Sequence, residues 1–189
     1  MAGANLTLDI FIHMDAVGRN DWSGPGDERP LTEIGKKQAA QIAEELSRAP
    51  IHALYSSPAK RCTESLQALS DKSGLPVTVL PGFRDTLGYK APAGWENPDR
   101  PGGDPLGGAV SAGSAFSALE EIEQQVPDGG RAVLCSYGDI VPALLAFLAG
   151  ASGVEMPAKT NKKGAVYTVK LQDGHASLSL SEPSTTFPQ

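Results

Sequence analysis

The sequence has almost no cysteine, no cluster of basic residues and no long apolar run, and each absence excludes a class of protein. Only two of its 189 residues are cysteines, Cys62 and Cys135. They lack the Cys-x-x-Cys spacing of a zinc or redox site, and isolated thiols are typical of a reducing compartment. We therefore predict no metal, no cofactor and a cytoplasmic protein.

Charge and hydropathy exclude two further kinds of partner. Lysine and arginine total 16 against 22 acidic residues, a net charge of −6, so nucleic acid and anionic membrane surfaces are not expected partners. The longest apolar stretch, residues 140–151, contains Pro142 and Gly150 and is shorter than the about 20 residues that cross a bilayer. The N-terminus lacks the basic region of a secretory signal. Composition leaves open whether the chain forms a homodimer.

Short apolar segments typical of strands alternate with helical segments along most of the chain. The first strand is expected at residues 6–12, and the most regular helix begins after Thr32, a good N-cap. Ser57 is expected to cap a further helix, with Pro58 at its first position. The remaining expected elements are strands at 51–55, 77–80 and 132–135, helices at 111–126 and 139–149, and a hairpin at 165–171 and 176–180. This order predicts an α/β fold with a three-layer, doubly wound, mostly parallel sheet, helices on both faces and a C-terminal hairpin.

A single domain is expected over residues 1–180, followed by a tail at 181–189. Within the domain, residues 81–109 differ from the rest, since 12 of these 29 residues are glycine or proline. A stretch of this length without secondary structure is either a functional lid or disordered. The segment also carries aromatic residues that could anchor it, Phe83, Tyr89 and Trp95. These anchors favour a lid.

Polar residues follow three of the expected strands. His13 ends the first, Ser56-Ser57-Pro58 with Arg61 follows the second, and Ser136-Tyr137-Gly138-Asp139 follows the fourth. The ligand crevice of a doubly wound sheet lies beyond the carboxyl ends of its strands. We therefore expect these groups to meet in one crevice.

In order and spacing these segments resemble the histidine phosphatase (phosphoglycerate mutase-like) superfamily, especially its phosphohistidine-phosphatase-like branch. The resemblance covers residues 6 to about 150. It rests on a first strand ending in His13, then Arg19, then Asp27-Glu28-Arg29-Pro30-Leu31-Thr32 with Gly35 and Gln38-Ala39, then Ser56-Ser57-Pro58-Ala59-Lys60-Arg61, and finally Cys135-Ser136-Tyr137-Gly138-Asp139. The resemblance implies the same fold, and it implies that His13 is a nucleophile and that Arg61 binds phosphate.

The sequence departs from the family pattern at two central positions. Ile12 stands where the family has the arginine of an Arg-His pair, and Tyr137 stands where it has a second histidine. Phosphoryl transfer relies on cations that face the phosphoryl oxygens, and loss of one such donor costs about 10²–10³ in rate. Ile12 supplies no charge and Tyr137 is neutral. We therefore expect ordinary phosphatase activity to be weak or absent.

The candidate site residues fall into two groups. Those expected to carry the chemistry are His13, Tyr137 and Asp85, the last near the family's usual proton donor. Those expected to hold an anion are Arg61, Arg19 and, at the start of a helix, Ser57. Each also has a structural interpretation, such as a hydrogen-bonded strand end for His13, a surface ion pair for Arg61 or space filling for Tyr137.

Three functions remain open. The first is a repurposed enzyme for a small anionic metabolite, phosphorylated or carboxylated, with His13 as acid, base or nucleophile. The second is a residual phosphomonoesterase or mutase that forms phospho-His13. The third is a catalytically inactive pseudophosphatase that binds a ligand or a protein partner through the same crevice.

Overall fold

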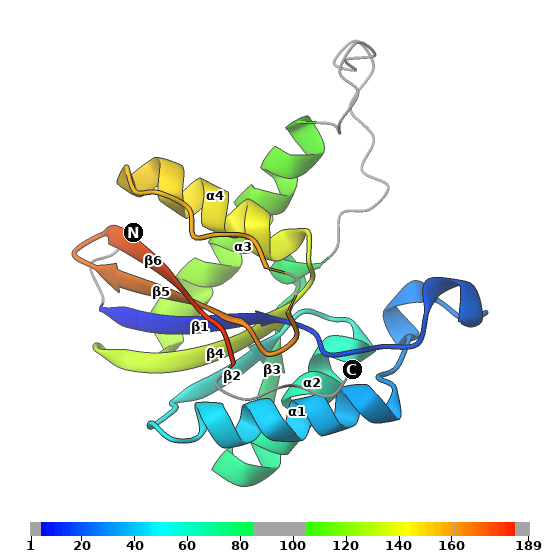
Figure 1. Cartoon of the computed structure of the whole chain (residues 1–189). Helices are drawn as coiled ribbons and strands as arrows, with labels where there is room; N and C mark the ends of the chain where they lie inside the picture. Colours follow the sequence, from blue (N-terminus) through cyan, green and yellow to red (C-terminus); the bar gives the residue numbers. More distant parts are fainter. Residues whose placement is uncertain (1–4, 85–104, 161, 184–189) are drawn as a thin grey trace.

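A six-stranded sheet forms the centre of the fold (Figure 1). The computed structural model describes residues 5–84, 105–160 and 162–183. The strands are β1 (Leu6–Ile12), β2 (Ala53–Ser56), β3 (Val77–Val79), β4 (Gly130–Ser136), β5 (Val166–Gln172) and β6 (His175–Ser181), in the order β3-β2-β4-β1-β5-β6. The first four strands run parallel, whereas β5 pairs antiparallel with β1 and β6. The expected α/β class, with a mostly parallel sheet and a C-terminal hairpin, is confirmed.

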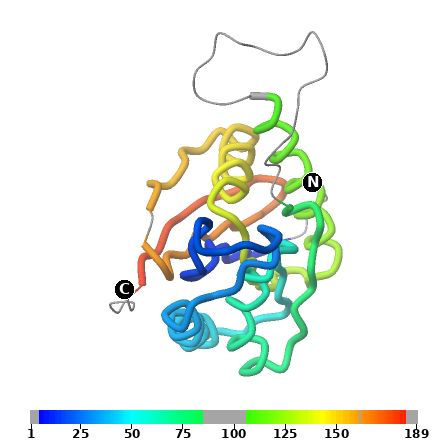
Figure 2. Tube along the Cα trace, turned by 90° about the vertical axis from the view of Figure 1, so that its right-hand side faces the viewer, coloured from blue at the N-terminus to red at the C-terminus, as the bar shows by residue number. Residues whose placement is uncertain are grey.

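Two pairs of helices cover the two faces of the sheet (Figures 1 and 2). Helix α1 (Glu33–Leu46) packs against α2 (Lys60–Ser73), and α3 (Pro105–Gln125) packs against α4 (Ile140–Ser152). Because both faces are covered, β1 and β4 are apolar almost throughout, and Leu8, Ile10 and Phe11 are fully buried. Among the described residues, no helix combines the length and the apolar character that a membrane span needs.

The helix after β2 begins later than the sequence predicted. Helix α2 starts at Lys60 after Ala59 as N-cap, and no side chain caps it, so the expected roles of Ser57 as cap and Pro58 as first helical residue are wrong. The backbone N–H of Ser57 instead donates to the carbonyl of Cys135, 3.0 Å away. This bond keeps the chain extended beside β4, and Ser57 is consequently buried at the end of β2.

Both ends of the segment 81–109 are helical, contrary to the expectation of a stretch without secondary structure. Pro81–Phe83 forms the short 3-10 helix η3, in which Phe83 is fully buried. Helix α3 begins at Pro105 rather than at residue 111, because proline is compatible with the first turn of a helix. The part that contains Tyr89 and Trp95 lies outside the described residues, so the lid stays a prediction.

The N-terminus of α1 is fastened to the loop that follows His13. Thr32 caps α1, as predicted, by accepting a hydrogen bond from Gly35 N at 3.0 Å, and its hydroxyl donates to the Asp15 carboxylate at 2.5 Å. The Asp15 N–H donates to Gln38 Oε1 at 2.9 Å. The two backbones approach so closely that a Cβ at Gly35 would lie 1.9 Å from the carbonyl oxygen of Asp15. Helix α1 therefore fixes the chain two residues beyond His13.

Replacing Gly35 by alanine should destabilise the protein, although alanine is the better helix former. A helical Gly→Ala change gains about 1 kcal/mol, whereas overpacking against the Asp15 backbone costs about 3 kcal/mol, so the free energy of unfolding should fall by about 2 kcal/mol in a urea titration. Gly113→Ala in α3 is the matched control, because a Cβ there meets nothing within 4 Å. This control should be stabilising, and equal effects of the two substitutions would contradict the close contact at Gly35.

Candidate active site

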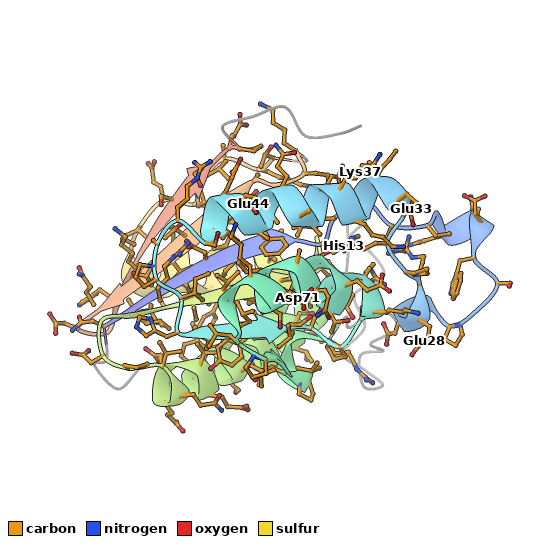
Figure 3. All side chains as sticks on the ribbon, turned by 90° about the horizontal axis from the view of Figure 1, so that it is seen from below. His13, Glu28, Glu33, Lys37, Glu44 and Asp71 are labelled. Carbon is orange, nitrogen blue, oxygen red and sulfur yellow. The ribbon has the colours of Figure 1, made fainter. Side chains whose placement is uncertain are left out.

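His13 lies directly after β1, at the carboxyl end of the parallel strands. The backbone N–H of His13 donates to the backbone carbonyl of Ser136 at the end of β4, 3.1 Å away. In Figure 3 His13 lies nearer to Glu33, at the start of α1, than to Glu44 near the end of that helix. The imidazole therefore lies at the sheet edge where a doubly wound fold places its ligand crevice.

One hydrogen bond fixes the tautomer of the neutral imidazole. Nδ1 of His13 lies 2.7 Å from the carbonyl oxygen of Met14. A carbonyl oxygen only accepts, so Nδ1 carries the proton and Nε2 keeps a free lone pair. His13 thus presents Nε2 as a base or a nucleophile.

Burial lowers the pKa of His13 to about 4, against the opposing effect of the bond to Met14. The positive charges of Lys163, Arg61 and Arg29 lower this pKa further because they disfavour an imidazolium. At neutral pH the ring is uncharged and has no proton to give from Nε2. The acid role left open by the sequence is therefore disfavoured, whereas the roles of base and nucleophile remain.

Arginines line a cavity of about 610 Å³. Arg19 and Arg61, both expected to hold an anion, lie in its wall together with Arg29 and Arg84, and Asp27 is the one acidic residue among the described lining. Because the charges of Arg61 and Arg29 act on the pKa of His13, the ring lies within electrostatic reach of the cavity wall. Four guanidinium groups gathered in a chain of net charge −6 fit an anionic ligand.

Three buried polar atoms at this site have no hydrogen-bond partner among the described residues, namely Arg61 Nε, Ser57 Oγ and Ser136 Oγ. The Arg61 guanidinium is held by a bond from Nη1 to the carbonyl of Gly26 at 2.9 Å, and it lies 4.8 Å from the centre of the Tyr137 ring. Buried polar groups are normally paired. Arg61 also lines the arginine-rich cavity, so its unpaired Nε marks a place where a bound anion would complete the hydrogen bonding.

Tyr137 brings a hydroxyl but no charge to the site. Its side chain is buried, and the hydroxyl donates to the Asp27 carboxylate at 3.4 Å. Burial raises the pKa of Tyr137 well above its ordinary value, and the negative charge of Asp27 acts in the same direction. Tyr137 therefore stays neutral at any physiological pH and offers a hydrogen bond rather than a readily transferred proton.

Lys163 is a further cation at His13, and it comes from the C-terminal part of the chain. It lies in the loop before β5, and because β5 pairs antiparallel with β1, this loop runs past the end of β1. Lys163 Nζ donates to the carbonyl oxygen of His13 at 2.7 Å. Lys163 also borders a second cavity of about 240 Å³ together with Ile12 and Gly138.

Sequence reasoning missed three of these cations, Arg29, Arg84 and Lys163. A signal existed for Arg29, which belongs to the Arg-Pro-Leu-Thr stretch that carries the family resemblance. No local pattern marks Lys163, because 150 residues separate it from His13 and only strand pairing joins them.

The other candidate residues have mixed outcomes. Asp85 lies outside the described residues, so its role as proton donor stays a prediction. Ser57 reaches the site as a buried hydroxyl close enough to Tyr137 to lower the pKa of that side chain, rather than as a helix cap. Over the described part of the chain, no three His, Cys, Asp or Glu side chains gather as a metal site would require. Cys62 and Cys135 are buried free thiols.

The chain belongs to the histidine phosphatase superfamily (branch 1), whose family model matches residues 17–182. This match confirms the resemblance that the strand-end motifs indicated. The family supplies the expected fold, while the departures inferred from the motifs at Ile12 and Tyr137 stay a prediction.

Individual relatives are similar at low sequence identity. An 8-oxo-(d)GTP phosphatase of Mycolicibacterium smegmatis is 23% identical over 168 residues, which are 89% of this chain and 45% of that protein, so the chain spans about half the length of this relative. Bacillus stearothermophilus YhfR superposes with a TM-score of 0.72 at 15% identity, covering 97% of this chain and 100% of that one. The protein histidine phosphatase SixA in complex with tungstate superposes with a TM-score of 0.60 at 22% identity, covering 94% and 97%.

The low pKa of His13 predicts how stability depends on pH. Unfolding returns the group from a pKa of about 4 to its ordinary value of 6.5, so between these values the unfolded chain binds more protons. The contribution of His13 to the free energy of unfolding should therefore fall as the pH drops from 6.5 to about 4 and stay constant below that. Urea titrations should show a smaller loss over this range in His13→Gln than in the wild type. An NMR titration of the His13 ring near 6.5 would contradict its burial among cations.

Proposed function

We propose that this protein is an enzyme that binds a small phosphorylated metabolite in the arginine-lined cavity, where Nε2 of His13 attacks phosphorus. The observation that carries this proposal is the state of the His13 ring. Its Nδ1–H is held by Met14, its pKa of about 4 keeps it neutral, and the charges of Arg61 and Lys163 act on it. A neutral Nε2 is nucleophilic, and the surrounding cations attract the anion that it would attack.

The comparisons support this substrate class. The Mycolicibacterium smegmatis relative is named for a phosphorylated small molecule, and the SixA structure holds tungstate, an oxyanion with the tetrahedral shape of phosphate. The four arginines of the cavity fit a ligand with more than one negative charge. A phosphorylated small molecule carries both a tetrahedral oxyanion and more than one negative charge.

The reaction that we propose has two steps. Nε2 of His13 forms a bond to phosphorus while the ester P–O bond breaks, and the leaving oxygen takes up a proton. Water then attacks phospho-His13, releases inorganic phosphate and returns the lone pair to Nε2. Arg61 offsets charge on the phosphoryl oxygens, and Asp85 is the candidate proton donor.

This reaction should be slow for two reasons that lie at the strand ends. Ile12 brings no positive charge to the phosphoryl group, and the raised pKa of Tyr137 prevents it from acting as an acid. The loss of a single stabilising donor costs about 10²–10³ in rate. The effects of groups that act as a unit are not additive in free energy, so the total loss in rate is not expected to equal the product of the two separate losses.

Two further functions share the same anion site. The unpaired buried atoms, Arg61 Nε among them, favour ligand binding even where no turnover follows, which is the function of a pseudophosphatase. The neutral Nε2 of His13 also suits a base that abstracts a proton from a phosphorylated or carboxylated metabolite. Both differ from the proposed function in that phospho-His13 does not form.

Formation of phospho-His13 is the first test. With p-nitrophenyl phosphate as probe, slow release of nitrophenol should accompany phosphorylation of His13, detected by mass spectrometry at alkaline pH, where phosphohistidine persists. His13→Asn should abolish both signals. His175→Asn is the control, because His175 is exposed on β6. Equal nitrophenol release from His13→Asn and the wild type would contradict the proposed nucleophile.

Restoring the family residues is the second test. The double variant Ile12→Arg/Tyr137→His should raise kcat for p-nitrophenyl phosphate by about 10² or more, because it returns a cation and a titratable group to the site. Ile12 borders the cavity of about 240 Å³, which has room for a guanidinium. Ile12→Met/Tyr137→Phe is the control and should give no gain. No gain in the double variant would favour proton abstraction over phosphoryl transfer.

A further inference from the structure

The ammonium group of Lys163 lies against the backbone of the proposed nucleophile. Nζ donates to the carbonyl oxygen of His13 at 2.7 Å, and this bond uses one of the three N–H donors of the ammonium. None of the ion pairs within 4 Å among the described residues involves Lys163, although the charge of Asp15 raises its pKa. Two donors and the positive charge are thus left to face another group.

The surroundings of this ammonium favour an anionic ligand. Lys163 is half-buried, and both burial and the charge of Arg29 lower its pKa. Of the three cations that act on the His13 ring, Lys163 has the largest effect, ahead of Arg61. A bound anion would compensate a cation that is partly removed from water and lies among other cations.

Lys163 also lies on the side of the site where β1 itself supplies no charge. The cavity of about 240 Å³ is bordered by Lys163, Ile12 and Gly138, and the Ile12 side chain points toward Gly138, with Cδ1 3.9 Å from where a Cβ would be. This cavity shares no described lining residue with the arginine-lined one. Cations bordering both cavities act on the pKa of His13, so the ring lies within electrostatic reach of both.

We propose that Lys163 is a phosphoryl-binding residue, which contacts the phosphoryl group at His13 from the Ile12 side while Arg61 contacts it from the side of the arginine-lined cavity. This inference rests on the proposed function. Cations on two sides offset charge that is spread over three phosphoryl oxygens, and the His13 carbonyl holds the ammonium in place for this contact. The loop before β5 then provides the positive charge that position 12 lacks.

Calorimetric binding of orthovanadate and inorganic phosphate tests this role. Lys163→Met keeps the length of the side chain and removes its charge, so the affinity should fall about 10- to 100-fold, the effect of one charge-assisted hydrogen bond. Lys163→Arg should keep most of the affinity. Lys162→Met is the matched control, because Lys162 borders the same cavity but is exposed and paired with Glu182 at 2.5 Å. The affinity of Lys162→Met for both anions should differ from that of the wild type by less than about twofold.

A second substitution separates this role from a structural one. Adding Ile12→Arg to Lys163→Met should restore about tenfold of the lost affinity, because the guanidinium enters the same cavity. If Lys163 only fastens its loop to β1, Lys163→Met will lower the melting temperature without ligand and leave anion affinity unchanged. That result overturns the inference, as does a failure of Ile12→Arg to recover any affinity.

Arg61 distinguishes failure of this inference from failure of the proposed function. If the wild type binds neither anion, or if Arg61→Lys and Arg61→Met both bind like the wild type, the proposed function fails and this inference fails with it. If the Arg61 variants bind weakly and Lys163→Met binds like the wild type, only the role of Lys163 is wrong. Melting temperatures without ligand show whether each variant is folded.

Discussion

The site depends on one backbone hydrogen bond, from the N–H of His13 to the carbonyl of Ser136. This bond continues the pairing of β1 with β4, so two segments far apart in the sequence meet with their polar ends together. Both strands are buried on both faces, and a shift of register would move apolar side chains out of their places in the core. The packing of the core therefore also fixes the position of His13 relative to the segment around Tyr137.

Burial and nearby positive charge together account for the neutral imidazole, and the same positive charge underlies the proposed binding of an anion. Burial and three nearby cations hold the pKa of His13 at about 4. The positive charge that opposes an imidazolium attracts an anion, and a bound anion offsets that charge, which raises the pKa of the ring. Nε2 therefore becomes more basic when the site is occupied. In the proposed reaction, His13 is therefore a stronger nucleophile in the complex than in the free protein.

The sequence was sufficient for features with local causes and insufficient for those that depend on tertiary pairing. Thr32 could be identified as the cap of α1 because capping is a contact within one turn. Ser57 was misassigned because a hydrogen bond to β4 outweighed the preference of serine and proline for a helix start. His13 and Arg61 could be found by motif, since each follows its own strand. Lys163 could not, because only the antiparallel pairing of β5 with β1 brings it to the site.

A comparison of motif positions alone predicts a larger loss of positive charge than the arrangement of cations around His13 supports. A motif records residue types at fixed sequence positions. The electrostatic stabilisation of a phosphoryl group depends on all the charges around it, whichever segments carry them. The charge missing at Ile12 therefore has a candidate replacement in Lys163. Burial raises the pKa of Tyr137, so its hydroxyl offers a hydrogen bond and no readily transferred proton, and proton transfer then depends on another group, for which Asp85 is the candidate. If Lys163 acts as proposed, it offsets part of the charge that position 12 lacks, and the larger deficit predicted for this site concerns proton transfer.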